Sequence, residues 1–288
     1  MQATLRCYLQ LTKPGIVAGN LLMGICGFIF AIPKEFDAPL FFSFSIGLSL
    51  IIASGSAINN YIDRASDRKM ERTQGRPLAT GIIPPTHALL LGALMGTLGV
   101  VLLWSFTTPL ATLLAIAGLL IYDLLYSFYK YRSPHATLIG AVAGALPPLI
   151  GYAAASCSFR SEALLLFFIL FFWQMPHFYA IALMRLEEYR AANIPVLPLR
   201  KGILQTKLHI VFYIFIFSFV IILPFFLHVA GTFYFIFSLI LSFIWIALSI
   251  QGFFAKKNRV WARYMFQFSL LILTSLVTIL CCFRLIHE

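Results

Sequence analysis

Nine long apolar stretches, separated by short polar segments, run along this chain. A helix needs about 20 mostly apolar residues to cross the hydrocarbon core of a bilayer, and each stretch approaches that length. The pattern therefore predicts an all-α polytopic membrane protein with nine transmembrane helices. No polar linker longer than about 25 residues separates the stretches, so we expect one membrane domain over residues 1–288. The expected spans lie near residues 14–32, 40–62, 87–105, 108–126, 136–155, 162–184, 207–229, 231–254 and 262–284.

The composition supports the same conclusion. Of the 288 residues, 61% are hydrophobic and only 11% are charged, and the mean hydropathy is +0.92. A soluble domain carries roughly 25% charged residues. A soluble protein is therefore excluded, and the lipid bilayer is the expected surrounding of most of the chain.

The basic residues indicate the orientation. All but three of the 21 Lys and Arg residues fall on the side of the membrane that holds the N-terminus; the exceptions are Lys34, Arg160 and Arg284. Because Lys and Arg are enriched in cytoplasmic loops, we expect a multi-pass protein of the bacterial cytoplasmic (inner) membrane, with its N-terminus inside and its C-terminus outside. The net charge of +11 then reflects topology and phosphate binding, and no nucleic acid is expected as a partner.

The most informative polar segment follows the second apolar stretch. Asn59, Asp63 and Asp67, hereafter the polar ladder, are spaced i, i+4 and i+8, so on a helix they project from one face about one turn apart. Mg²⁺ is commonly held by one or two carboxylates together with substrate phosphates. We therefore take the ladder as the candidate catalytic group, with Asp63 and Asp67 as metal ligands and Asn59 as a further oxygen ligand or hydrogen-bonding group.

Cations surround the polar ladder. Arg and Lys side chains bind phosphate oxygens through charge-assisted hydrogen bonds, so the combination suggests an enzyme that handles a lipid diphosphate at the membrane edge. Interfacial anchoring would explain the cations but not the two Asp residues, since acidic residues contribute little to orientation. The candidate diphosphate-binding residues are Arg68, Lys69, Arg72, Arg76 and Lys130.

A second polar loop follows the sixth apolar stretch on the same side. Both loops begin inside a hydrophobic helix and end in a basic, Pro-containing segment, so we expect them to form opposite lips of one central cavity that opens to the inside face. His177 lies about two turns inside its helix, where an ionisable residue is a functional candidate, although a hydrogen bond to a neighbouring helix is the alternative. Trp173 and Tyr179 are expected either to line a prenyl or porphyrin pocket or to pack in the core.

The second loop also leaves the role of its acidic residues open. Glu187 and Glu188 could complete a second metal site, or they could pair with Arg185 and Arg190 at the surface. We keep Arg185, Glu187 and Glu188 as second-loop candidates under both interpretations.

Together these motifs resemble a known family. Asn59-xxx-Asp63-xxx-Asp67, continued by Arg72-Thr73 and Arg76-Pro77, looks like the signature of the UbiA-type intramembrane prenyltransferase superfamily. The segments Thr137–Gly140, Pro147–Tyr152, Trp173–His177 and Tyr189–Pro198 are similar to those of the heme O synthase family within it. The resemblance runs from about Leu11 to Lys201, and the combination of motifs is highly specific.

The resemblance implies transfer of a farnesyl group from farnesyl diphosphate to the vinyl group of heme B, with addition of water, to give heme O and diphosphate. Heme B would be a substrate and Mg²⁺ the cofactor, and terminal oxidase or heme A synthase machinery would be partners. Asp63 and Asp67 would hold Mg²⁺, and His177 would orient the heme as an iron ligand. One departure stands out: where many members of the superfamily have a second Asp-xxx-Asp motif, this chain has only Glu187 and Glu188.

Three other functions remain compatible with the residues. The first is the same reaction with a hydroxybenzoate or a quinone precursor as acceptor. The second is an ion-coupled transporter, in which intramembrane Asp and His residues form a relay. The third is a non-catalytic protein for heme delivery or oxidase assembly. The clustering of charges at one membrane face argues against the transporter.

Overall fold

The computed structural model describes residues 2–31, 36–156 and 160–287 and contains only helices and loops in that part of the chain. Lys34 lies outside the described residues. Among the residues described, nine helices are long and apolar enough to cross a membrane, which confirms the predicted all-α membrane fold. The nine spans are α2 (Pro14–Ala31), α3 (Ala38–Asp67), α5 (Pro85–Phe106), the continuous segment α6-η1-α7 (Pro109–Leu120, Ile121–Tyr126, Ser127–Lys130), α8 (Ala136–Ala155), α9 (Ser161–Met184), α12 (Ile203–Phe226), α13-η2 (Thr232–Gln251, Gly252–Phe254) and α14 (Asn258–His287).

Four short helices lie in the segments that connect or precede these spans: α1 (Gln2–Leu11), α4 (Pro77–Thr80), α10 (Leu186–Ala191) and α11 (Leu197–Arg200). Local chemistry fixes several of the starts. Asp37 caps α3 by accepting a hydrogen bond from the Leu40 amide at 2.9 Å, and Thr108 caps α6 in the same way at Ala111. Both residues satisfy amide groups that the first helical turn leaves without partners.

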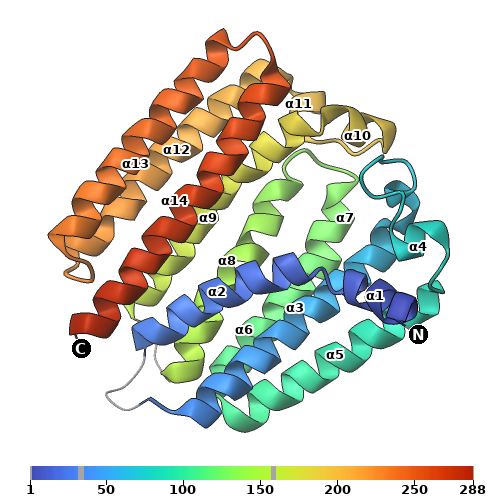
Figure 1. The fold of residues 1–288 in the computed structure, drawn as a ribbon, viewed down its shortest axis with the longest axis horizontal. Helices are drawn as coiled ribbons and strands as arrows, with labels where there is room; N and C mark the ends of the chain where they lie inside the picture. The colour runs from blue at the N-terminus through green and yellow to red at the C-terminus, as the bar shows by residue number, and fades with distance from the viewer. Residues whose placement is uncertain (1, 32–35, 157–159, 288) are drawn as a thin grey trace.

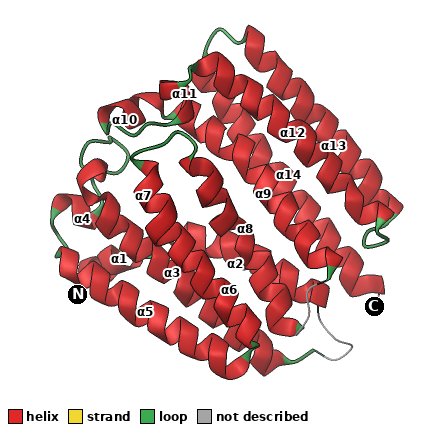
Figure 2. Cartoon of the chain, turned by 180° about the vertical axis from the view of Figure 1, so that it is seen from behind, coloured by secondary structure: helices red, strands yellow, loops and turns green. Residues whose placement is uncertain are grey.

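The spans form one closed bundle. Successive helices α2, α3, α5 and α6 pack against one another, α8 and α9 are the most deeply buried, and α14 returns to contact α2. Figure 1 shows α9, α12, α13 and α14 as one group of long helices on one side, and α3 and α5 on the other, with α2 and α8 between them. Seen from behind in Figure 2, the loops near α4 and those around α10 and α11 lie at the same end of the bundle.

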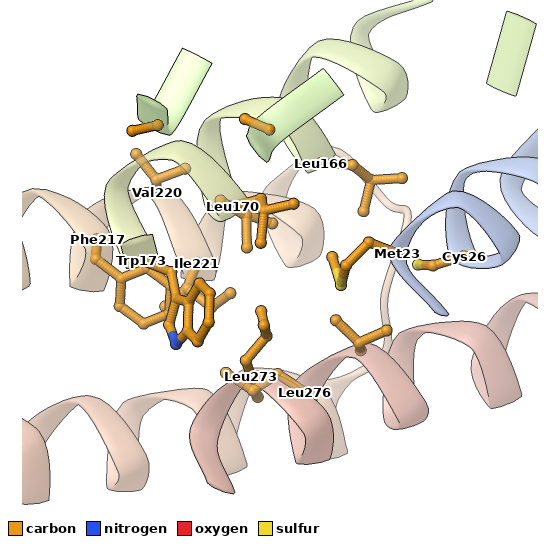
Figure 3. Close-up of a cluster of buried hydrophobic side chains, with 14 of the residues drawn as sticks. Met23, Cys26, Leu166, Leu170, Trp173, Phe217, Val220, Ile221, Leu273 and Leu276 are labelled. Atoms are coloured by element: carbon orange, nitrogen blue, oxygen red, sulfur yellow. The ribbon is translucent and has the colours of Figure 1, made fainter. Parts of the chain in front are cut away.

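Aliphatic, aromatic and sulfur-containing side chains fill the interior between the helices. Figure 3 shows Met23 of α2, Leu170 of α9, Ile221 of α12 and Leu273 of α14 converging on one cluster. Since lipid tails are as apolar as these side chains, such contacts stabilise the bundle through close van der Waals packing rather than through exclusion from water.

Helices α2 and α8 approach each other closely enough to bring backbone against backbone. A Cβ atom added at Gly27 would lie 1.9 Å from the Pro148 carbonyl oxygen, and one added at Gly151 would lie 1.8 Å from the Gly24 carbonyl oxygen. Both distances are far inside van der Waals contact, so the crossing requires glycine at these two positions. The approach matters for function because both helices line the cavity described next.

Candidate active site

A cavity of about 520 Å³ lies between α2, α3, α6, α8, α9 and α14. Its walls are mainly apolar and include Met23, Ile51 and Leu273, while Lys130 and Tyr189 lie at the end that carries the charged loops. A volume of this size is typical of a site for a small organic ligand. The cavity therefore joins an apolar interior to a polar end.

The polar ladder lies beside that end, on the last three turns of α3, and is linked to the cavity by Lys130, which lines the cavity and contacts Asp63. Helix α3 continues to Asp67, beyond the apolar run, so all three ladder residues are helical, and all three are buried. The prediction that they share one helical segment is confirmed.

Asp63 is held by the last residue of the fourth span and by the residue after it. Lys130 donates from Nζ to Asp63 Oδ2 at 2.5 Å, and the Tyr131 hydroxyl donates to Oδ1 at 2.7 Å. Burial raises the pKa of Tyr131 to about 12, so this phenol keeps its proton and can donate at neutral pH. Both carboxylate oxygens of Asp63 are thus already directed toward a cationic or donating group.

Asp67 is held from the other side by the loop after α3. A single nitrogen of Arg76, Nη1, lies 3.0 and 2.8 Å from the two Asp67 carboxylate oxygens. The Thr73 hydroxyl donates to the Asp67 carbonyl oxygen at 3.1 Å and fixes the loop over the helix end. The structure therefore brings Arg76, a candidate diphosphate-binding residue, to the ladder.

Asn59 meets a residue that the sequence had not suggested. Lys13, at the junction of α1 and α2 with a left-handed φ of +50°, donates from Nζ to Asn59 Oδ1 at 2.7 Å. Burial, followed by repulsion from Arg76, lowers the pKa of Lys13 to about 8. The Asn59 amide nitrogen is buried and has no hydrogen-bond partner, so this residue has unused capacity to bind a further group.

The remaining first-loop cations are less closely tied to the ladder. Arg68 donates from Nε to the Ala79 carbonyl oxygen at 2.9 Å and supports its own loop, and Lys69 is exposed to solvent. Arg72 reaches across to the second loop, where its Nε lies 3.8 Å from Glu188 Oε2. This contact brings the two polar loops together.

The two glutamates of the second loop have different surroundings. Glu188 is largely buried and accepts from Arg185 Nη1 at 2.9 Å, in addition to its contact with Arg72. Glu187 is 76% exposed at its side chain and pairs with Arg190 at 2.5 Å, three residues further along the chain. Of the two acidic residues, only Glu188 therefore faces the first loop.

The aromatic candidates of α9 also differ in whether they line the cavity. Trp173 and His177 line the cavity and stack on one another, with ring centroids 4.7 Å apart. Tyr179 points away from the cavity and packs against His209 and Tyr213 of α12. His177 Nδ1 lies 2.7 Å from the hydroxyl of Ser269 on α14.

Three residues at the site were given no functional role from the sequence. Lys13 and Tyr131 stand next to expected spans, where a basic or aromatic residue is usually an interfacial anchor. Ser269 lies in an apolar stretch 92 residues after His177 and carries no local signal.

Comparison with known proteins establishes the family. A model of the UbiA prenyltransferase family matches residues 20–271. The protoheme IX farnesyltransferase of Protochlamydia amoebophila (strain UWE25) is 45% identical over 269 residues, which cover 93% of this chain and 95% of that protein. The chain belongs to the UbiA prenyltransferase family.

Solved structures show that the fold is shared with other UbiA proteins. A digeranylgeranylglyceryl phosphate synthase superposes with a TM-score of 0.82 at 21% identity, covering 99% of each chain. A UbiA homologue from Archaeoglobus fulgidus, bound to DMAPP and Mg²⁺, superposes with a TM-score of 0.68 at 17% identity, covering 93% of this chain and 99% of that chain. At such identities the likeness is one of fold.

Proposed function

We propose that this UbiA-family chain transfers the farnesyl group of farnesyl diphosphate to a vinyl group of heme B, with addition of water, and releases heme O and diphosphate. The observation that supports the proposal is the cavity, whose apolar interior contains His177 and whose polar end contains Lys130, the partner of Asp63. The 45% identity to a protoheme IX farnesyltransferase over nearly the whole chain supports the choice of substrates.

The polar ladder is the proposed diphosphate end. The carboxylates of Asp63 and Asp67 offer the oxygen ligands that Mg²⁺ prefers. The Asn59 amide nitrogen has no hydrogen-bond partner and is a donor, so in this proposal it would donate to a diphosphate oxygen. The described residues contain no group of three or more His, Cys, Asp or Glu side chains that could hold a metal. The pair of carboxylates in the ladder fits Mg²⁺ that is bound by one or two carboxylates together with substrate phosphates. When bound, Mg²⁺ supplies positive charge that stabilises the leaving diphosphate.

The cations now paired with the ladder have a second role in this proposal. Lys130 and Arg76 neutralise Asp63 and Asp67, and they would be available to diphosphate oxygens if the carboxylates held a metal ion. Arg72 extends the cationic surface toward the second loop. Preorganised charge of this kind stabilises a transition state without a protein nucleophile.

The chemistry follows from leaving-group departure. The bond between C1 of the farnesyl chain and its diphosphate oxygen breaks, and the terminal carbon of the vinyl group bonds to C1. The positive charge passes to the vinyl carbon next to the porphyrin ring, where it is delocalised. Water adds its oxygen at that carbon and releases one proton. The products are heme O, diphosphate and a proton.

The apolar part of the cavity is the proposed site for the porphyrin and the prenyl chain. His177 is the proposed ligand of the heme iron, and the Trp173 ring stacks on its imidazole with ring centroids 4.7 Å apart. The charge distribution supports a chain in the bacterial inner membrane with the ladder on the cytoplasmic side. Heme A synthase or terminal oxidase machinery would consume the product.

A comparison of two glutamates tests the loop contact. We expect Glu188→Gln to raise KM for farnesyl diphosphate about 5-fold, since a weakened partly buried ion pair costs about 1 kcal/mol. Glu187→Gln removes an exposed pair and should change KM less than about 2-fold. Steady-state kinetics of the purified protein in detergent measures both. Equal effects of the two variants would show that the contact between the loops does not shape the diphosphate site.

The choice of acceptor is tested with purified protein, farnesyl diphosphate and Mg²⁺. With heme B, we expect stoichiometric release of diphosphate and formation of heme O, and with a hydroxybenzoate acceptor we expect neither. Prenylation of hydroxybenzoate with no change to heme B would overturn the proposal in favour of a quinone-precursor enzyme. Heme binding without diphosphate release would favour a delivery protein, and ion transport without diphosphate release would favour a transporter.

A further inference from the structure

Ser269 of α14 connects both aromatic residues of the apolar site. Its hydroxyl oxygen lies 2.7 Å from His177 Nδ1, and its carbonyl oxygen accepts a 2.6 Å hydrogen bond from Trp173 Nε1. Ser269 is fully buried in a predominantly apolar span. One residue of α14 thus contacts two residues of α9, four positions apart on that helix.

The hydrogen-bond partners of Ser269 determine where its single proton lies. The hydroxyl oxygen is 2.6 Å from the Phe266 carbonyl oxygen. A carbonyl can only accept, and two oxygens this close require a proton between them. Since the serine proton is directed to Phe266, the serine oxygen must accept from His177. The proton on His177 is therefore on Nδ1.

A neutral imidazole with its proton on Nδ1 has a free lone pair on Nε2. The ring is also held in its plane, because Trp173 stacks on it with an angle of 24° between the rings. His177 lines the cavity, and Nε2 is its remaining ring nitrogen for a ligand there. Histidines that bind metals are usually oriented in this way, by a hydrogen bond from their other nitrogen.

We propose that Ser269 is a positioning residue that holds His177 in the Nδ1–H tautomer and presents its Nε2 lone pair to the iron of heme B. The inference rests on the proposed function, because it takes heme B as the occupant of the cavity. Ser269 does not touch the reacting atoms. Its effect is on the affinity and the ligation state of the acceptor substrate.

Two substitutions with side chains of nearly equal shape distinguish the effect of losing the hydroxyl group from the effect of a change in packing. Ser269→Thr keeps the hydroxyl and Ser269→Val replaces it with a methyl group. The matched control is Ser249→Ala on α13, since Ser249 is also buried and also donates to the carbonyl three residues earlier, at 2.7 Å, and has no histidine partner among the bonds described. Purified variants are titrated with ferric heme B, and the Soret band and dissociation constant are measured.

We expect the wild-type protein, Ser269→Thr and Ser249→Ala to share one histidine-ligated Soret band and one dissociation constant, within about 2-fold. For Ser269→Val we expect the band to shift and the dissociation constant to rise about 10-fold or more, as for other groups that orient metal ligands. A wild-type band and affinity in Ser269→Val would overturn the inference. If Ser269→Val does not fold, Ser269→Ala replaces it in the same comparison.

Failure of the positioning role can be distinguished from failure of the proposed function. Formation of heme O by the wild-type protein is measured in the same preparation. If heme O forms and Ser269→Val binds heme normally, the positioning role is wrong and the function stands. If no heme O forms under any condition, the function itself is wrong.

Discussion

Asp63→Asn is expected to lower kcat for prenyl transfer by about 10²–10³-fold, the loss seen when one preorganised charge-stabilising group is removed from an active site. Asp63 is the middle residue of the polar ladder. Its two carboxylate oxygens accept hydrogen bonds from Lys130 and Tyr131, respectively. Asparagine keeps the size of the side chain but loses the negative charge that would hold Mg²⁺ in the proposed mechanism. The measurement is single-turnover formation of product at saturating substrates, which separates chemistry from binding.

The single substitution has a second consequence that needs its own control. Removing Asp63 leaves Lys130 buried without its counter-charge, and breaking one side of a buried pair can cost about 3–5 kcal/mol. The double variant Asp63→Asn with Lys130→Met removes both charges and should recover the apparent melting temperature without recovering turnover. Glu187→Gln, which removes an exposed carboxylate near the same loops, should keep full activity. An Asp63→Asn protein with wild-type turnover would exclude the ladder as the catalytic group.

Gly27→Ala and Gly151→Ala are expected to cause the largest loss of stability among single-methyl additions. The new methyl group would meet backbone oxygens at 1.9 and 1.8 Å, and a backbone cannot rotate away as a side chain can. Overpacking of this kind costs typically about 1–3 kcal/mol and occasionally more, so α2 and α8 must separate or the protein must unfold.

The matched control lies on the same helix. Gly19 of α2 has no atom within 4 Å of an added Cβ, so Gly19→Ala should leave the melting temperature nearly unchanged. Thermal melting of the three variants in detergent, followed by circular dichroism, makes the comparison. Equal melting temperatures for Gly27→Ala and Gly19→Ala would contradict the close crossing of α2 and α8.

The helical pattern and the polar ladder could be predicted from the sequence because both are local. Apolar stretches of bilayer length identify the spans, and the i, i+4, i+8 spacing places Asn59, Asp63 and Asp67 on one face wherever the helix lies. Even the meeting of the two polar loops was expected from their position on one side of the membrane, and the contact of Arg72 with Glu188 shows it.

Partners distant in the sequence could not be predicted in the same way. Lys13 meets Asn59 across 46 residues, and Ser269 meets His177 across 92, and neither pairing leaves a trace in the local pattern. The burial of Tyr179 against α12 was also undecided, because an aromatic residue on an apolar helix can face a cavity or a neighbour equally well. Nothing in the sequence distinguished Glu187 from Glu188. In the structure, the short helix α10 exposes Glu187 to solvent.

The most direct test of the proposed function is mass spectrometry of hemes extracted from membranes that contain the wild-type chain, compared with membranes that contain Asp63→Asn at equal abundance. With the wild-type chain we expect a heme species heavier than heme B by one farnesyl unit plus water, and with the variant we expect this species to be absent. Membranes with the wild-type chain that contain only heme B, when farnesyl diphosphate and heme B are both abundant, would contradict the central claim.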